Sequence, residues 1–460
     1  MSESLFSRLK MKVEENPELG IGILISIPIF LFIFLAWIND NFMILDHSYW
    51  IGIIAFNCVI FYGIYFVYTK KRIEVSTRIL YYGIGLSLLI LFLFQNIAFS
   101  GDITVGVIDG ARLLWDGQNP YVVEGVRHAI PDIPGEFRLT TYPYLPVDLL
   151  TYSLFLGLLS FLSAIFMEME LFFPIRFVLD LFLTTFVRVF KPILEMIDIF
   201  NVLPELSTTG IVSFLPGFNG MGILLTNLFF LSISSILIYK ILDCKKQEAI
   251  VLGLVFFTIM IWNNVCLAQT LFFAGWYFHK KEIGSLTLLF WSLSMLSKYF
   301  AGIFIVGYLI QYFHKKDYFT TIRLSLIPIV LTIIFFLPFG VIETLNSTVL
   351  FYNTEQRILD GSFGGSIFSE IILFFNLEEI TWLFTLIGFM CILVIILQIK
   401  DLYERLVVGS LTSLLVISGM SAQFFPMILF ILILSNNVCI FDYQKGITDS
   451  EATKKPHEEH

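Results

Sequence analysis

The chain has 460 residues, of which 57% are hydrophobic and only 14% are charged, and its mean hydropathy is +0.85. Soluble domains carry about 25% charged residues, so this composition excludes an ordinary soluble protein and predicts an integral membrane protein that contacts membrane lipids. The net charge of −9 provides no basic stripe for nucleic acid, and we expect no nucleic-acid partner.

Apolar segments recur along almost the whole chain. Because about 20 apolar residues cross a bilayer as a helix, these segments predict an all-α, polytopic bundle of about 14 spans. The weakest of them is 171–190, where Arg176, Asp180 and Arg188 interrupt the apolar run. An amphipathic helix on the membrane surface is the alternative for that segment. The predicted spans are 19–38, 49–69, 79–99, 145–166, 171–190, 221–240, 249–262, 265–279, 284–297, 299–313, 321–340, 380–399, 404–419 and 421–440.

The distribution of basic residues predicts the orientation of these spans. With the N-terminus in the cytoplasm, most of the 28 Lys and Arg residues fall in cytoplasmic segments, as the positive-inside rule requires. The C-terminal tail is then also cytoplasmic and, being polar and charged, is predicted to be disordered. Three sizeable segments face outward, and any chemistry must come from them and from the adjoining span ends: Ser100–Tyr144, about Phe190–Gly220, and Val341–Glu379.

The first outer segment opens with residues 100–121, SGDITVGVIDGARLLWDGQNPY, directly after a predicted span. Asp102 is placed to cap a helix from about Ile103 to Trp115, and Gly117 is placed to end it. We expect this helix to lie flat on the membrane surface, on an apolar side formed by Val105, Ile108 and Leu113.

Two short elements of this region carry a family resemblance. An acidic residue after an early span, a surface helix, GQNPY at 117–121 and YPYLP at 142–146 together resemble the GT-C glycosyltransferases. The similarity is greatest to the polyprenyl-phosphate-mannose-dependent branch, glycosyltransferase family 87. The chain departs from that pattern at Tyr144, where the family has a second proline. The resemblance implies a GT-C-like catalytic unit over 79–440, preceded by extra spans and a cytoplasmic loop over 1–78 and followed by the tail at 441–460.

The resemblance implies an inverting transfer of a sugar, mannose in that branch, from a polyprenyl phosphate to a hydroxyl of a lipid or glycan acceptor. The reaction would take place on the extracytoplasmic face and needs a carboxylate as general base. Asp102 matches the position of the family's catalytic aspartate, although a helix cap is its alternative role. Asp109 is the alternative base. It lies about 10 Å further along the same helix, too far from Asp102 for a carboxylate pair, and Arg112 is its expected partner.

Basic side chains must hold the phosphate that leaves in such a reaction. Lys298, at the outer end of a short span, and Arg357, in the third outer segment, are the candidates. Snorkelling is the alternative for Lys298, and an ion pair with Glu355 or Asp360 is the alternative for Arg357. The remaining substrate-binding candidates are Gln269, which equally suits a packed polar contact between helices, and the tyrosines of the two resembling elements, Tyr121 and Tyr142.

Other classes of protein remain open at this point. A secondary transporter or lipid flippase would show inverted repeats, which the spans do not visibly have, and a polysaccharide polymerase or ligase would also use a lipid-phosphate donor. A non-catalytic scaffold would need none of the candidate residues. The outer loops contain no DxD motif, and we expect neither a metal nor a cofactor. The plasma membrane and the endoplasmic reticulum are equally compatible with the sequence.

Overall fold

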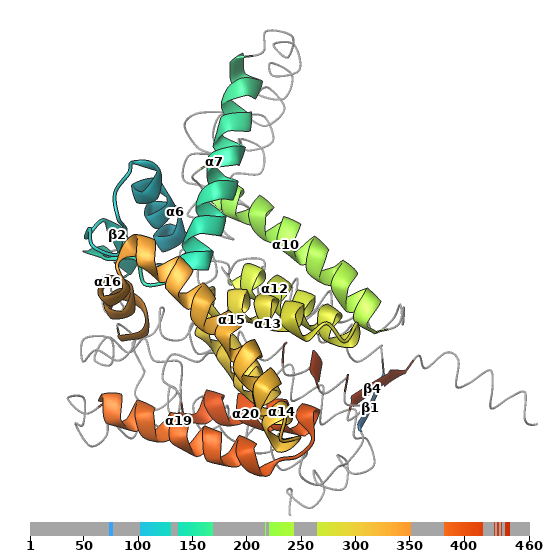
Figure 1. The fold of residues 1–460 in the computed structure, drawn as a ribbon. Helices are drawn as coiled ribbons and strands as arrows, with labels where there is room; N and C mark the ends of the chain where they lie inside the picture. The colour runs from blue at the N-terminus through green and yellow to red at the C-terminus, as the bar shows by residue number, and fades with distance from the viewer. Residues whose placement is uncertain are drawn as a thin grey trace, which may run out of the picture.

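The computed structural model describes residues 73–76, 102–129, 137–168, 217, 220–242, 265–350, 381–416 and 438–441, and the single positions 427, 430, 431 and 434. This part of the chain is mostly helical (Figure 1). Five of the predicted spans lie outside it: 19–38, 49–69, 79–99, 171–190 and 249–262. The loop that contains Arg357 and the tail at 442–460 also lie outside the described residues.

The helices begin and end close to the predicted boundaries. The α-helices are α6 (Asp102–Trp115), α7 (Pro146–Glu168), α10 (Gly220–Ile241), α12 (Val265–Lys280), α13 (Gly284–Met295), α14 (Gly302–His314), α15 (Tyr318–Phe336), α16 (Val341–Leu345), α19 (Thr381–Gln398) and α20 (Leu402–Val416). Short turns of other helix types are η4 (Tyr299–Ala301), η5 (Leu337–Phe339) and the π-helical η6 (Asn346–Leu350).

Among the described residues, three helices are long and apolar enough to cross a membrane. They are the segments Pro146–Ile165, Gly222–Ile241 and Tyr318–Phe339, and three shorter apolar helices accompany them. Long apolar helices of this kind indicate a membrane protein, as the composition predicts.

Helix α12 packs against both α10 and α13, and hydrogen bonds between these helices give their relative directions. The Thr270 hydroxyl donates to the Phe230 carbonyl at 3.0 Å, and Lys280 Nζ donates to the Ile241 carbonyl at 2.7 Å, so α10 and α12 run in the same direction. The Trp291 indole donates to the Phe272 carbonyl at 3.1 Å. The Ser294 hydroxyl donates to the Ala268 carbonyl at 2.6 Å, so α13 returns antiparallel to α12.

Aromatic side chains fill the space between α12, α14 and α20. The rings of Phe272 and Phe304 lie 4.7 Å apart, and those of Phe273 and Phe430 lie 4.8 Å apart. The Trp276 ring stacks on Tyr403 at 5.7 Å. Edge-to-face and offset pairs of this kind stabilise a core beyond the area that they bury, so they join helices that are distant in the sequence.

Helix α7 differs from the predicted topology. Its Tyr152 hydroxyl donates to the Asn227 side chain, whereas a turn later Leu156 contacts Gly222. Later residues of α7 therefore meet earlier residues of α10, and the two helices run in opposite directions. The predicted spans 145–166 and 221–240 both run from the outer to the cytoplasmic side, so the antiparallel packing of α7 and α10 differs from that order, and the orientation of the spans in a membrane stays a prediction.

In the described part of the chain, four short strands accompany the helices, so the mostly helical fold is not strictly all-α. Strands β2 (Val126–Ala129) and β3 (Phe137–Thr140) form an antiparallel pair in which Val126 faces Thr140. Strands β1 (Ile73–Ser76) and β4 (Val438–Phe441) pair in parallel, so the last predicted span, 421–440, ends in a strand. Neither pair has the long alternating pattern that identifies a strand in sequence.

One end of the bundle is held by cations that cap helix ends. Arg405 is fully buried near the start of α20. Its guanidinium donates to the carbonyls of Ile399 and Lys400, just beyond the end of α19, at 2.6 Å to 3.0 Å, and to the Gly307 carbonyl at 2.8 Å. Lys280 caps α10 in the same way. We call this the basic end.

Candidate functional site

Helix α6 forms as the sequence predicts. Asp102 is its first residue, and Gly117 follows it with a φ of +74°, a conformation that a glycine adopts without strain. The Gly117 and Gln118 amides donate to the Leu114 and Leu113 carbonyls at 3.1 and 2.9 Å, which closes the end of the helix. The side chain of Asp102 lies outside the described structure, so its role as general base stays a prediction.

The structure places α6 alongside the first half of α7. The Trp115 indole donates to the Ser153 carbonyl at 2.8 Å, and the same ring packs on Gly157, where there is no room for a β-carbon. The position of α6 relative to a bilayer surface stays a prediction. Through these contacts with α7, the C-terminal end of α6 lies beside the first half of that helix.

The GQNPY element joins the first outer segment to the third. The Asn119 side-chain amide donates to the Phe339 carbonyl at 2.8 Å, and its oxygen accepts from the Tyr121 amide at 3.0 Å. The Ser347 hydroxyl donates to the Tyr121 carbonyl at 3.0 Å. These bonds span more than two hundred residues of sequence, so the loop after α6 is attached to the chain segment that leads toward Arg357.

Three tyrosines of the two resembling elements pack together in the buried interior. The Tyr121 hydroxyl donates to the Tyr144 carbonyl at 2.8 Å. The Tyr142 ring lies edge-on to the rings of Tyr121 and Tyr144, at 5.7 and 5.3 Å, and presses against Gly110 of α6. Burial, reinforced by the nearby Asp148, raises the pKa of Tyr121 and Tyr142 well above the ordinary value. Both phenols therefore remain neutral donors.

Asp148 lies beneath these tyrosines and was not among the predicted site residues. It is fully buried in the first turn of α7. Its carboxylate accepts from the Tyr142 hydroxyl at 3.4 Å and from the Ser297 hydroxyl at 3.3 Å. The adjoining Val147 amide donates to the Leu296 carbonyl at 3.2 Å. Its sequence signal was an acidic residue inside an apolar span, which is costly without a structural or functional role.

Lys298 contacts this arrangement through Tyr144. It precedes η4, and its Nζ lies 4.2 Å from the centre of the Tyr144 ring, within the range of a cation–π interaction. The side chain is half-buried. We call the group the tyrosine cluster, and its members are Tyr121, Tyr142, Tyr144, Asp148 and Lys298.

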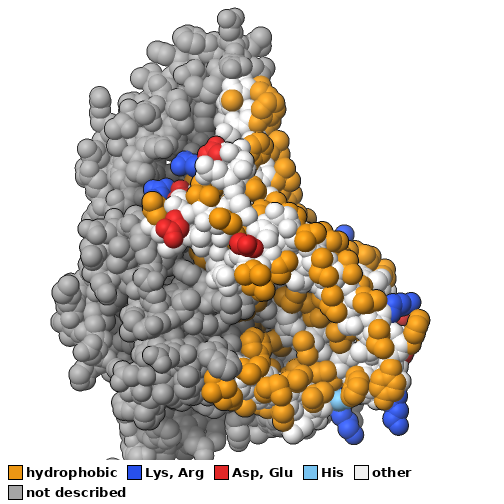
Figure 2. Space-filling view, turned by 60° about the vertical axis from the view of Figure 1, so that its left-hand side comes forward, with side chains coloured by type: hydrophobic (Ala, Val, Ile, Leu, Met, Phe, Trp, Pro, Cys, Tyr) orange, Lys and Arg blue, Asp and Glu red, His pale blue; other side chains and the backbone are white. Residues whose placement is uncertain are grey.

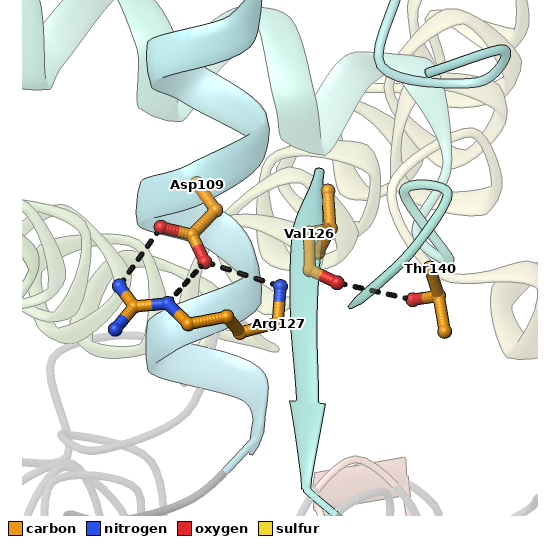
Figure 3. A network of polar contacts seen from close by, with 4 residues as sticks. All are labelled: Asp109, Val126, Arg127 and Thr140. Carbon is orange, nitrogen blue, oxygen red and sulfur yellow. Dashed lines mark hydrogen bonds and ion pairs between the residues drawn. The ribbon is translucent and has the colours of Figure 1, made fainter. Parts of the chain in front are cut away.

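Asp109 forms an ion pair with Arg127, a residue that the sequence analysis did not single out (Figure 3). Arg127 Nε and Nη2 donate to the two carboxylate oxygens at 2.8 and 2.9 Å, and its backbone amide donates at 3.1 Å. The expected partner was Arg112, one turn further along the same helix. The observed partner lies on β2, because the unpredicted hairpin places that strand against α6.

This geometry weakens the case for Asp109 as the alternative base. Three hydrogen bonds occupy its oxygens, so it is not free to accept a proton from a substrate without breaking the pair. The hydrogen bonds to Asp109 also raise the pKa of Arg127. About half of the Arg127 side chain is exposed, whereas Asp109 is buried, so the arginine is the member of the pair that faces outward.

Two further predicted contacts, Gln269 and Arg357, stay untested by the described structure. Gln269 is fully buried in α12, and within the described structure neither atom of its amide has a hydrogen-bond partner. Most residues of α12 are buried around it, and its contact with a sugar stays a prediction. Arg357 lies outside the described residues, and its contact with phosphate stays a prediction.

Comparisons of the chain with protein-family models, with curated proteins and with solved structures find no match. Within the described residues, no group of three or more His, Cys, Asp or Glu side chains could hold a metal ion. The chemistry of the candidate site must therefore be argued from its own residues.

Proposed function

We propose that the chain is a membrane glycosyltransferase with a GT-C-like bundle, about 14 spans and an active site on the extracytoplasmic face. The observation that carries the proposal is the tyrosine cluster. The two elements that resemble the family are 20 residues apart in sequence, and the predicted phosphate ligand Lys298 is far from both. All three meet in one place, where the Lys298 ammonium lies over Tyr144.

The contacts between chain segments support the proposed topology for most of the described helices. Residues predicted to face outward contact one another, as Tyr121 does with Ser347, and Asn119 contacts Phe339 at the outer end of the predicted span 321–340. Residues predicted to be cytoplasmic also meet, as Lys280 does with Ile241. Such segregation is expected if the two groups lie on opposite sides of a membrane. Helix α7 is the exception, because it runs antiparallel to α10.

In the proposed reaction, Asp102 takes the proton from an acceptor hydroxyl. The hydroxyl oxygen forms a bond to the anomeric carbon of the sugar, and the bond from that carbon to the phosphate oxygen breaks with inversion. The electron pair leaves with the polyprenyl phosphate, whose charge Lys298 and Arg357 stabilise. The product is a glycosidic bond to a lipid or glycan acceptor, and the apolar spans hold the polyprenyl tail.

The test is sugar transfer by the purified protein in detergent. Polyprenyl-phosphate-mannose and polyprenyl-phosphate-glucose are each offered with a crude extract of acceptor lipids, to the wild type and to Asp102→Asn. Asp116→Asn is the matched control, because it removes an exposed carboxylate just beyond the other end of α6.

We expect transfer by the wild type and the control and a loss of at least about 100-fold in Asp102→Asn, the scale of a missing general base. Transfer that survives in Asp102→Asn would contradict the assignment of the base. No transfer from either donor by a folded wild type, with no binding of either donor, would contradict the enzyme class.

A further inference from the structure

Helix α15 presents a continuous apolar stripe that the rest of the described structure leaves uncovered. Its most exposed member, Phe319, has 77% of its surface accessible, and Ile322 follows with 64%. The segment Tyr318–Phe339 is long and apolar enough to cross a membrane, and only 17% of it is buried. The other large exposed side chains of the stripe are Leu326, Ile329, Val330, Ile333, Ile334 and Leu337.

One end of this stripe is positively charged. The turn between α14 and α15 carries Lys315 and Lys316, and Arg323 follows one turn into α15 next to Ile322. All three side chains are exposed. Between Lys315 and Arg323 the chain carries one acidic residue, Asp317, which caps α15 by accepting from the Thr320 amide at 3.1 Å and also interacts electrostatically with Arg323. The corner therefore keeps an excess of positive charge.

The opposite end of the stripe has no such charge. Across residues 324–350, which the structure describes throughout, Glu343 is the only charged residue, and it is exposed. The stripe is thus an apolar surface about 30 Å long, with three cations at one end and one carboxylate beyond the other end. Figure 2 shows the apolar character of the described surface, with Lys and Arg side chains at its edges.

We propose that the corner formed by Lys315, Lys316 and Arg323 binds the headgroup of an anionic phospholipid, whose acyl chains lie along the apolar stripe of α15. An apolar stripe alone accepts any lipid, so the charges decide the choice. Arginine and lysine next to a bilayer attract anionic headgroups by about 1 kcal/mol each. Arg323 is placed for this role because its guanidinium can reach the headgroup level from a position one turn inside the helix.

The aromatic residues of the corner support an interfacial position. The rings of Phe313 and Tyr318 pack edge-to-face at 5.7 Å, and both side chains are about half exposed. Tyrosine is enriched where acyl chains meet headgroups, because its ring is apolar and its hydroxyl is polar. Tyr318 begins α15, between the two lysines and Arg323 in the sequence, so an interfacial position of Tyr318 places the three cations close to the headgroups.

The experiment measures lipid selectivity of the full chain in phosphatidylcholine vesicles. Electron paramagnetic resonance of spin-labelled phosphatidylglycerol and spin-labelled phosphatidylcholine gives their relative association with the protein. The test variant is Lys315→Gln, Lys316→Gln, Arg323→Gln. The matched control removes the same number of charges beyond the last described strand, as Lys445→Gln, Lys454→Gln, Lys455→Gln.

We expect the wild type and the control to associate with phosphatidylglycerol at least about threefold more strongly than with phosphatidylcholine. The test variant should lose most of this preference. For the wild type, about 1 M salt should also reduce the preference for phosphatidylglycerol, because the Debye length at that concentration is about 3 Å. This measurement does not depend on whether a variant folds. A wild type without preference, or a test variant with an unchanged one, would overturn the proposal. Neither result depends on sugar transfer.

Discussion

The tyrosine cluster and the basic end are each organised by one buried ionisable side chain, an acidic one in the first and a basic one in the second. In the tyrosine cluster a buried carboxylate, Asp148, accepts from hydroxyl groups of two distant segments. At the basic end a buried guanidinium, Arg405, donates to a backbone carbonyl just beyond the end of α19 and to the Gly307 carbonyl within α14. An acidic group gathers side chains that donate, whereas a basic group closes helix ends whose carbonyls lack partners.

This difference separates a site from a scaffold. The groups around Asp148 are side chains: Tyr142 belongs to one of the elements that resemble a glycosyltransferase, and Ser297 precedes the predicted phosphate ligand Lys298. The groups around Arg405 are mainly backbone carbonyls, which any sequence provides, together with the ring of His314, whose Nδ1 lies 3.4 Å from the guanidinium. We therefore expect changes at the basic end to act on stability and changes in the tyrosine cluster to act on function as well.

The largest loss of stability is expected from Arg405→Met. The substitution keeps most of the aliphatic side chain and leaves the carbonyls of Gly307, Ile399 and Lys400 without this donor, which should cost about 3 kcal/mol. Thermal unfolding in detergent, followed by circular dichroism, measures the effect. Arg323→Met, at an exposed position, is the control and should change stability by less than about 0.5 kcal/mol. Equal midpoints for the two variants would show that Arg405 does not hold the basic end.

A smaller loss is expected from Asp148→Asn. The amide keeps the size of the carboxylate and weakens the bonds from Tyr142 and Ser297, since bonds to a charged acceptor are worth about 2 kcal/mol. The unfolding midpoint should fall, and reaction of Lys298 with an amine-specific reagent, read by mass spectrometry, should change in rate. A lower midpoint with an unchanged Lys298 rate would make Asp148 a support of the fold alone.

The smallest effect is expected at the ion pair of Asp109 and Arg127. One partner is about half exposed, and pairs of this kind contribute about 1 kcal/mol or less. A double-mutant cycle with Asp109→Asn and Arg127→Gln, measured by chemical unfolding at low and high salt, gives the coupling energy. A coupling of several kcal/mol, insensitive to salt, would place this pair with the buried groups instead.

The sequence predicted local features well and distant contacts poorly. Apolar runs located the helices, and Asp102 and Gly117 located the ends of α6, because these signals lie within one segment. The bond between Ser297 and Asp148 joins residues 149 positions apart, and no local pattern reports such a contact. The β2–β3 pair was missed because each strand has four residues, too few to show a period. The direction of α7 depends on packing against α10, which charge counts along the chain do not determine.

The most direct test of the central claim is the binding of a fluorescent polyprenyl phosphate to the wild type and to Lys298→Met, measured by anisotropy in detergent. Lys240→Met is the control, because Lys240 is an exposed lysine in the last turn of α10. Losing a charged hydrogen bond to phosphate should weaken binding at least about tenfold in Lys298→Met and leave the control unchanged. Equal affinity of all three proteins would contradict the account of the tyrosine cluster as a site for a lipid phosphate.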